Sequence, residues 1–185
     1  SPLAADQETA EFPTDGFVGA GFFSFEERLG PRELLHLSVG LKEVYPEIYL
    51  LTLDPGEARY SRFLEEFRLP VPRQSSAGDS VHLYSAGGGF YFGSVPFRLF
   101  QQMTPPKCGE LSEPGRFSGH KPLVLFDSGC SEGGMYDVRS DPHFFELLDH
   151  CVIAAPADSE KLTRAYEFLR QCVSYHPEIR ASILF

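Results

Sequence analysis

Phe17-Val18-Gly19-Ala20-Gly21-Phe22-Phe23 is a mostly apolar run near the start of the chain. A run of this kind is typical of a strand that is buried on both faces. After Gly30-Pro31, apolar residues recur at helical spacing as far as Pro46, and proline is tolerated in the first turn of a helix. A second buried strand follows over residues 48–53. A strand, a helix and a strand joined by short connections predict a parallel β-α-β unit.

The rest of the chain repeats this alternation. The apolar patterns predict strands over residues 81–85, 123–126, 151–155 and 181–185, and helices over residues 58–67, 95–103, 144–148 and 158–172. The expected fold class is therefore α/β, with an open, mostly parallel, doubly wound sheet of 5–6 strands and helices on both faces.

The domain organisation is expected to be simple. Residues 1–15 are polar and favour a flexible lead-in, and residues 16–185 favour a single domain. The chain ends on the apolar run Ile183-Leu184-Phe185, which suggests a domain excised from a longer protein.

Composition excludes several classes of function. The 185 residues carry a formal net charge of −10, which disfavours nucleic acid and anionic membrane surfaces as partners. No apolar run approaches the roughly 20 residues that span a bilayer, so direct membrane insertion is not expected. The four cysteines show no metal-binding spacing and favour reduced thiols in the cytoplasm, with Cys151 and Cys172 acting as small buried apolar residues.

Three segments carry a resemblance to a known family. Residues 121–129 resemble the strand and acidic residue of a Walker B segment, and residues 51–56 resemble the D-x-D-P-Q segment that ends the second strand of MinD/ParA-type ATPases. Residues 149–156, with the helix that follows, are similar to the next strand and helix of that family. The resemblance covers nearly the whole chain and implies a P-loop NTPase-like fold of the SIMIBI class.

The same resemblance implies a degenerate phosphate loop. If the last glycine of the deviant Walker A pattern K-G-G-V-G-K-[ST] falls on Gly30, the signature lysine falls at Glu26, next to Glu27. The P-loop lysine falls at Pro31, and the magnesium-binding Ser/Thr falls at Arg32. The two acidic positions that remain are Asp54 of the D-x-D-P-Q segment and Asp127 of the Walker B segment.

The chemistry of this loop argues against phosphate binding on its own terms. A P-loop directs backbone N–H groups, a helix N-terminus and an ammonium group at polyphosphate. Glu26 and Glu27 add negative charge there, and Pro31 lacks an N–H donor. We therefore expect a pseudo-ATPase without a cofactor, in which ATP·Mg binding is lost or weak. The resemblance implies a scaffold or regulator that binds a protein partner or dimerises, in a bacterial positioning or secretion machinery.

Other readings of the sequence are open. An active MinD/ParA-type ATPase could use a displaced phosphate loop at Gly87-Gly88-Gly89, although an ordinary loop is the simpler interpretation. A caspase-like cysteine hydrolase could pair Cys130 with His82. The aromatic residues around residues 22–25 and 90–92 could line a docking surface at the carboxyl ends of the strands or fill that space. Surface or capping roles are the simpler interpretation of the histidines that could bind a metal: His36, His120, His143, His150 and His176.

Overall fold

The computed structural model of the chain describes residues 16–25, 31–52, 65, 82–94, 121–130 and 142–184. Its strands are β1 (Val18–Ser24), β2 (Ile48–Thr52), β3 (His82–Gly87), β4 (Phe90–Ser94), β5 (Leu123–Cys130), β6 (His150–Ala154) and β7 (Arg180–Leu184). Its helices are α1 (Pro31–Leu41), α4 (Pro142–Glu146) and α5 (Ser159–Tyr175). The lead-in predicted over residues 1–15 and the helix predicted over 95–103 lie outside the described residues, as does nearly all of the helix predicted over 58–67.

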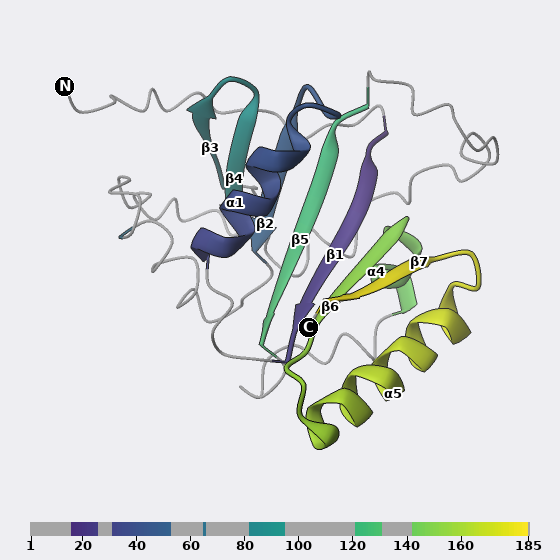
Figure 1. Cartoon of the computed structure of the whole chain (residues 1–185). Helices are drawn as coiled ribbons and strands as arrows, with labels where there is room; N and C mark the ends of the chain where they lie inside the picture. Colours follow the sequence, from purple (N-terminus) through teal and green to yellow (C-terminus); the bar gives the residue numbers. More distant parts are fainter. Residues whose placement is uncertain are drawn as a thin grey trace, which may run out of the picture.

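The described strands form one open sheet in the order β3-β4-β2-β5-β1-β6-β7 (Figure 1). All neighbouring strands pair in parallel except β3, which pairs antiparallel with β4 at one edge. The predicted α/β class with a mostly parallel, doubly wound sheet is confirmed. The expected 5–6 strands become seven, because β4 was not recognised in the sequence.

The hairpin that β3 and β4 form is the cause of this difference. Gly88 and Gly89 make its turn with positive φ values of 62° and 76°, in the left-handed region that glycine adopts without steric cost. From the sequence, the glycines were expected to form a loop, and the aromatic residues 90–92 were expected at the carboxyl ends of the strands; that location is wrong for Phe90, which pairs with Ile48 at the amino end of β2. Phe90 and Phe92 instead belong to β4 and are buried.

Helices cover both faces of the sheet, as the alternation of side chains along the strands requires. On one face, the side chains pack with Leu34 of α1, and this cluster includes Val18, Ala20, Phe22, Ile48, Leu50, Leu123 and Leu125. On the other face, the side chains pack with α4 and α5, and this cluster includes Phe23, Tyr49, Leu51, Val124, Phe126, Cys151 and Ile153. Consecutive residues of the central strands thus enter opposite cores.

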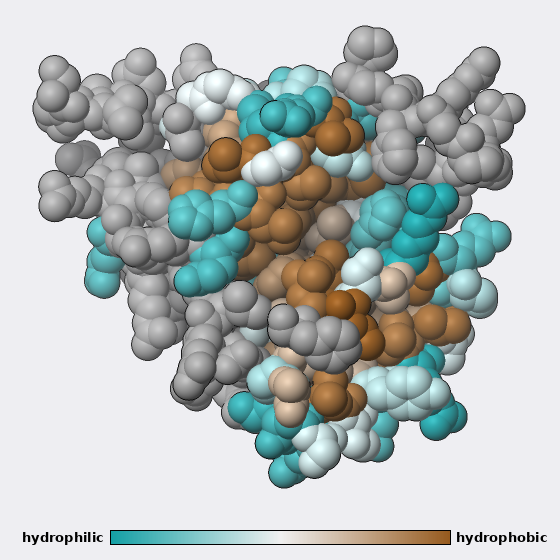
Figure 2. Space-filling model, viewed as in Figure 1, coloured by the Kyte–Doolittle hydropathy of each residue, from teal (hydrophilic) through white to brown (hydrophobic). Residues whose placement is uncertain are grey.

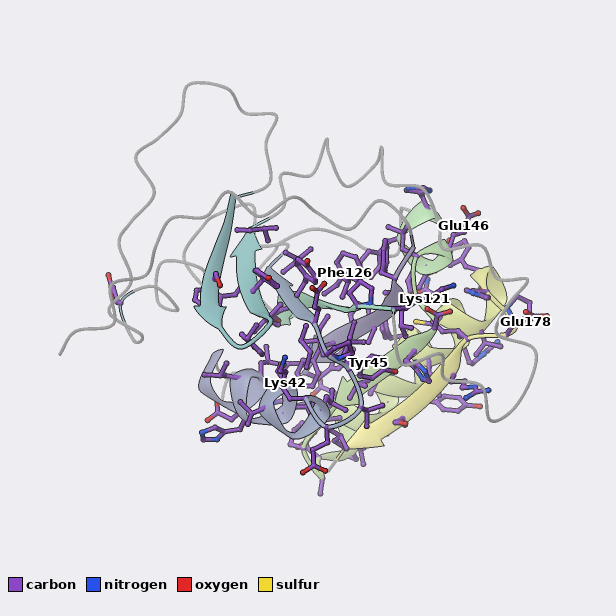
Figure 3. All side chains as sticks on the ribbon, turned by 90° about the horizontal axis from the view of Figure 1, so that it is seen from above. Lys42, Tyr45, Lys121, Phe126, Glu146 and Glu178 are labelled. Atoms are coloured by element: carbon purple, nitrogen blue, oxygen red, sulfur yellow. The ribbon has the colours of Figure 1, made fainter. Side chains whose placement is uncertain are left out.

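Phenylalanine dominates the core between the sheet and α4 and α5. The ring of Phe126 lies 5.9 Å from that of Phe144, and the ring of Phe23 lies 5.8 Å from Phe144 and 4.5 Å from Phe168. Edge-on pairs of this kind add about 0.5–1.5 kcal/mol each beyond the burial of their area. Figure 3 shows Phe126 near the middle of the sheet. These phenylalanines therefore serve the core.

The helix α5 begins at the predicted cap. The side chain of Asp158 accepts hydrogen bonds from the backbone N–H groups of Glu160, at 2.9 Å, and Lys161, at 3.2 Å. These bonds satisfy donors that the first turn of a helix leaves unpaired. The helix continues to Tyr175, three residues beyond the predicted end.

The junction of β1 with the start of β6 depends on a single glycine. The N–H of Gly19 donates to Asp149 Oδ2 at 2.9 Å, and the carbonyl of Gly19 accepts from the N–H of Asp149 at 2.8 Å. A Cβ at Gly19 would lie 1.9 Å from the carbonyl oxygen of Leu147, which is far inside van der Waals contact. Only glycine lets the backbones of β1 and the turn after α4 approach this closely.

Replacing Gly19 tests this junction. We expect Gly19→Ala to lower the free energy of unfolding by about 3 kcal/mol and the Tm by about 6–12 °C, because backbone rather than a flexible side chain blocks the new methyl group. Gly40→Ala on α1 is the matched control, since its Cβ meets nothing within 4 Å. That variant should gain about 0.5–1 kcal/mol. Equal melting temperatures for the two variants would contradict the proposed role of Gly19.

Charged and titratable side chains lie around Asp149 at the amino edge of the sheet. Burial raises the pKa of Asp149, and the Gly19 N–H, His150, His176 and Lys121 oppose that shift. Burial lowers the pKa of His150, aided by Arg180 and opposed by Asp149. The folded protein therefore favours neutral His150.

The lowered pKa of His150 predicts a loss of stability in mild acid. The stability that neutral His150 contributes is fully present above its ordinary pKa of 6.5 and is lost as the pH falls through the lower folded value. We expect the Tm of the parent protein to drop more between pH 7 and pH 5 than that of His150→Gln, measured by circular dichroism. Parallel curves for the two proteins would contradict this assignment.

Candidate functional site

The candidate site lies at the carboxyl edge of the sheet, where β5 and β1 end side by side (Figure 1). From β1 the chain winds through β2 to β4 in one direction, and from β5 it winds through β6 to β7 in the other. Open α/β sheets bind ligands at such a switch point, outside the carboxyl ends of the strands. The topology therefore selects the same edge that the sequence resemblance implied.

Asp127 is the acidic residue that the structure places at this edge. It is opposite Phe22 of β1 and Thr52 of β2, and only 4% of its surface is exposed. The sequence predicted a strand over residues 123–126, with Asp127 after its end. In the structure β5 continues to Cys130, so Asp127 lies inside the strand. A buried carboxylate with hydrogen-bonding capacity at this position can orient water or a cation beside a ligand.

The strand β1 leaves the sheet in a fixed direction. Its pairing with β5 is irregular between Phe22 and Ser24, and Ser24 is 1% exposed. The N–H of Phe25 donates to the carbonyl of Ala154 at 2.9 Å, and the ring of Phe25 lies 6.0 Å from that of Phe168. Ser24 and Phe25, which directly precede the proposed phosphate loop in the sequence, are thus part of the core. The buried serine carried no signal in the sequence that would have shown this.

The helix α1 begins beside this edge without its usual donor and with an acidic first turn. Pro31 is its first residue and has no N–H, and Glu33 lies in its first turn. Acidic side chains stabilise the positive end of a helix dipole, and the negative charge of Glu33 is unfavourable for a second anion at this helix end. Glu33 was not singled out from the sequence, although an acidic residue two positions after Pro31 is an ordinary signal of a helix start.

The remaining residues of the proposed phosphate site are only partly described. Glu26, Glu27 and Gly30 lie outside the described residues, and so does Asp54, the second retained acidic position. Arg32 is the second residue of α1. Their proposed roles stay predictions from the sequence.

The glycine triplet lies at the opposite edge from Asp127. Phe90, which follows Gly89, pairs with Ile48 at the amino end of β2, and the carbonyl of Gly89 accepts from the N–H of Ile48. A phosphate held at these glycines would be separated from Asp127 by the length of the strands. The interpretation of Gly87-Gly88-Gly89 as a displaced phosphate loop beside Asp127 is therefore wrong, and the ordinary loop is confirmed as the turn of a hairpin.

The sheet order also separates the proposed hydrolase pair. Cys130 ends β5 and His82 begins β3, with β2 and β4 between these two strands. Three strand spacings of about 4.8 Å place their backbones at least about 14 Å apart, beyond the reach of a cysteine–histidine hydrogen bond. This arrangement argues against the cysteine hydrolase.

The described part of the chain holds neither a metal cluster nor a membrane-spanning helix. No three side chains of His, Cys, Asp or Glu there are grouped so that they could hold a metal ion. Four of the histidines considered as ligands lie on different elements: His36 on α1, His143 on α4, His150 on β6 and His176 at the end of α5. His120 lies outside the described residues. No helix in those segments combines the length and apolar character required to cross a membrane.

Comparison with known proteins identifies the fold. No protein-family model and no curated protein sequence matches the chain. The structure is similar to that of a plasmid partition protein from Borrelia burgdorferi, with a TM-score of 0.50 and 10% sequence identity over 89% of this chain and 77% of that chain. An iodide-soaked crystal of the partition protein gives a TM-score of 0.47 and 7% identity. At this identity, the first similarity shows the fold alone, which is an open and mostly parallel α/β sheet with helices on both faces.

Proposed function

We propose that this chain is a MinD/ParA-like domain that has lost ATP hydrolysis and acts as a scaffold or regulator by binding a protein partner. The observation that carries the proposal is the start of α1. The helix that should point its N-terminus at phosphate begins with Pro31, which lacks a donor, and has Glu33 in its first turn. The fold and the buried Asp127 support a nucleotide-binding ancestry, whereas the groups around the helix terminus oppose phosphate.

The surface supports a role in binding another protein. Figure 2 shows apolar side chains gathered across the middle of one face, over β5, β1 and β6. Several large apolar side chains are exposed on the described elements and their ends: Leu37, Val39, Val44, Tyr166, Val173, Tyr175 and Leu184. The strand residues on that face, such as Phe22 and Leu125, are almost completely buried. The candidates for a docking site are therefore the exposed residues Leu37, Val39 and Val44 on α1 and just after it. Exposed apolar side chains that lie together mark sites where proteins associate. In a positioning or secretion machinery, such binding would be constitutive, because no nucleotide switch would control it.

The central prediction concerns ATP. Two missing ammonium contacts at about 1.5–3 kcal/mol each weaken a micromolar site by about 10²- to 10⁴-fold, to a Kd of about 0.1–10 mM. Isothermal titration with ATP and magnesium should therefore detect no binding at micromolar concentrations. The mass of the protein by light scattering should also be the same with and without ATP and magnesium. Low-micromolar binding of ATP would overturn the proposal.

Restoring the loop tests whether the proposed alignment is right. The triple variant Glu26→Lys, Pro31→Lys and Arg32→Thr places the family's phosphate-gripping residues at the positions that the resemblance assigns. We expect its affinity for ATP·Mg to rise at least about 10-fold over the parent chain. Adding Asp127→Asn should remove the magnesium dependence of that gain, with circular dichroism as the control for folding. No gain in a folded triple variant would show that the alignment on Gly30 is wrong.

A further inference from the structure

Two cysteines meet in the core between the sheet and α5. Cys151 is the second residue of β6, and Cys172 lies in the last turns of α5. A helix that connects two parallel strands runs back along them, so the end of α5 returns over the amino end of β6. The two thiols are hydrogen-bonded to each other. The fold thus brings together two thiols that the sequence separates by a complete helix.

Both thiols are sealed from solvent. Cys151 and Cys172 are each 0% exposed and belong to the same apolar cluster, and both are free. Cys172 shares the inner face of α5 with Ala165 and Phe168. The hydrogen bond and the burial raise the pKa of the Cys151 thiol. The closed protein therefore protects the pair from reaction, and α5 must lift before either sulfur can react.

We propose that Cys151 and Cys172 form a redox-sensitive pair whose oxidation to a disulfide ties α5 to β6. Because the two thiols already interact inside one apolar cluster, forming a disulfide between them needs no change in the order of the elements. The bond would close a loop of about 20 residues and restrict the unfolded chain. It would also hold α5 against Phe25, which packs on Phe168 of that helix at the exit of β1.

The chemistry balances with a small disulfide as the oxidant, such as oxidised glutathione. When α5 opens, one cysteine thiolate attacks a glutathione sulfur, the glutathione S–S bond breaks, and a mixed disulfide forms with release of one glutathione thiolate. The second cysteine thiolate then attacks the protein sulfur of the mixed disulfide and releases the second glutathione. Two protein thiols are oxidised, one glutathione disulfide is reduced, and the two protons end on glutathione.

The test compares the folded and unfolded chain in the same redox buffer. The double variant Cys108→Ser and Cys130→Ser leaves only the proposed pair. It is equilibrated with reduced and oxidised glutathione in buffer and in urea, starting from both the reduced and the oxidised protein. After acid quenching and alkylation, the disulfide-bonded protein carries no alkyl group and weighs about 2 Da less than the unmodified reduced protein. Peptide mapping then identifies the linked residues.

We expect the equilibrium constant for the disulfide to be about 100-fold larger in the folded protein than in urea, because the fold holds the sulfurs together. The oxidised protein should melt about 6–12 °C higher than the reduced protein. Cys151→Ala and Cys172→Ala in the same background are the controls and should form only mixed disulfides with glutathione. The proposal would be overturned if the equilibrium constant were no larger in the folded protein than in urea, or if the disulfide formed only between chains. Peptide mapping of the oxidised parent chain gives the same answer if the double variant does not fold.

Discussion

The close contact between the β1 backbone and the turn after α4 is the constraint on which the second half of the structure depends. Gly19 exchanges two hydrogen bonds with Asp149 and leaves no room for a side chain against Leu147. The next residue after Asp149 begins β6, so this contact sets β6 beside β1 in its register. The backbone N–H of Arg180 also donates to the Asp149 carbonyl, which extends the same junction to β7.

The position of the candidate site at the end of β1 follows from this packing. Because β1 lies between β5 and β6, its carboxyl end reaches the edge of the sheet beside Asp127 on one side and Ala154 on the other. Ser24, the last residue of β1, and Phe25 after it are buried in the core. The proposed phosphate loop, with Glu26 and Glu27, follows Phe25 directly in the sequence. The fold supplies the switch point at which open α/β sheets bind ligands. That the side chains for phosphate are replaced there stays a proposal from the sequence.

The sequence located two described residues of this candidate site, because strand ends and helix starts leave local signals. Asp127 came from the resemblance of residues 121–129 to a Walker B segment, and Pro31 from its place ahead of a helical pattern. Ser24 was missed because its burial depends on β5 and β6, which lie far away in sequence. The glycines before Phe90 were considered for phosphate binding because composition cannot tell which end of a sheet a turn occupies; that depends on the pairing of β4 with β2.

The sequence by itself determined the described elements of this protein except β4, through periodicity and local chemistry. The apolar runs specified two-sided burial, the spacing of the leucines specified α1, and Asp158 specified the start of α5. Only the tertiary structure decided the strand order, the edge hairpin, the burial of Asp127 and the meeting of Cys151 with Cys172. The physical reason is the separation of the partners along the chain. Gly19 and Asp149 are 130 residues apart, and no local pattern in either segment encodes a contact that forms only when the sheet assembles.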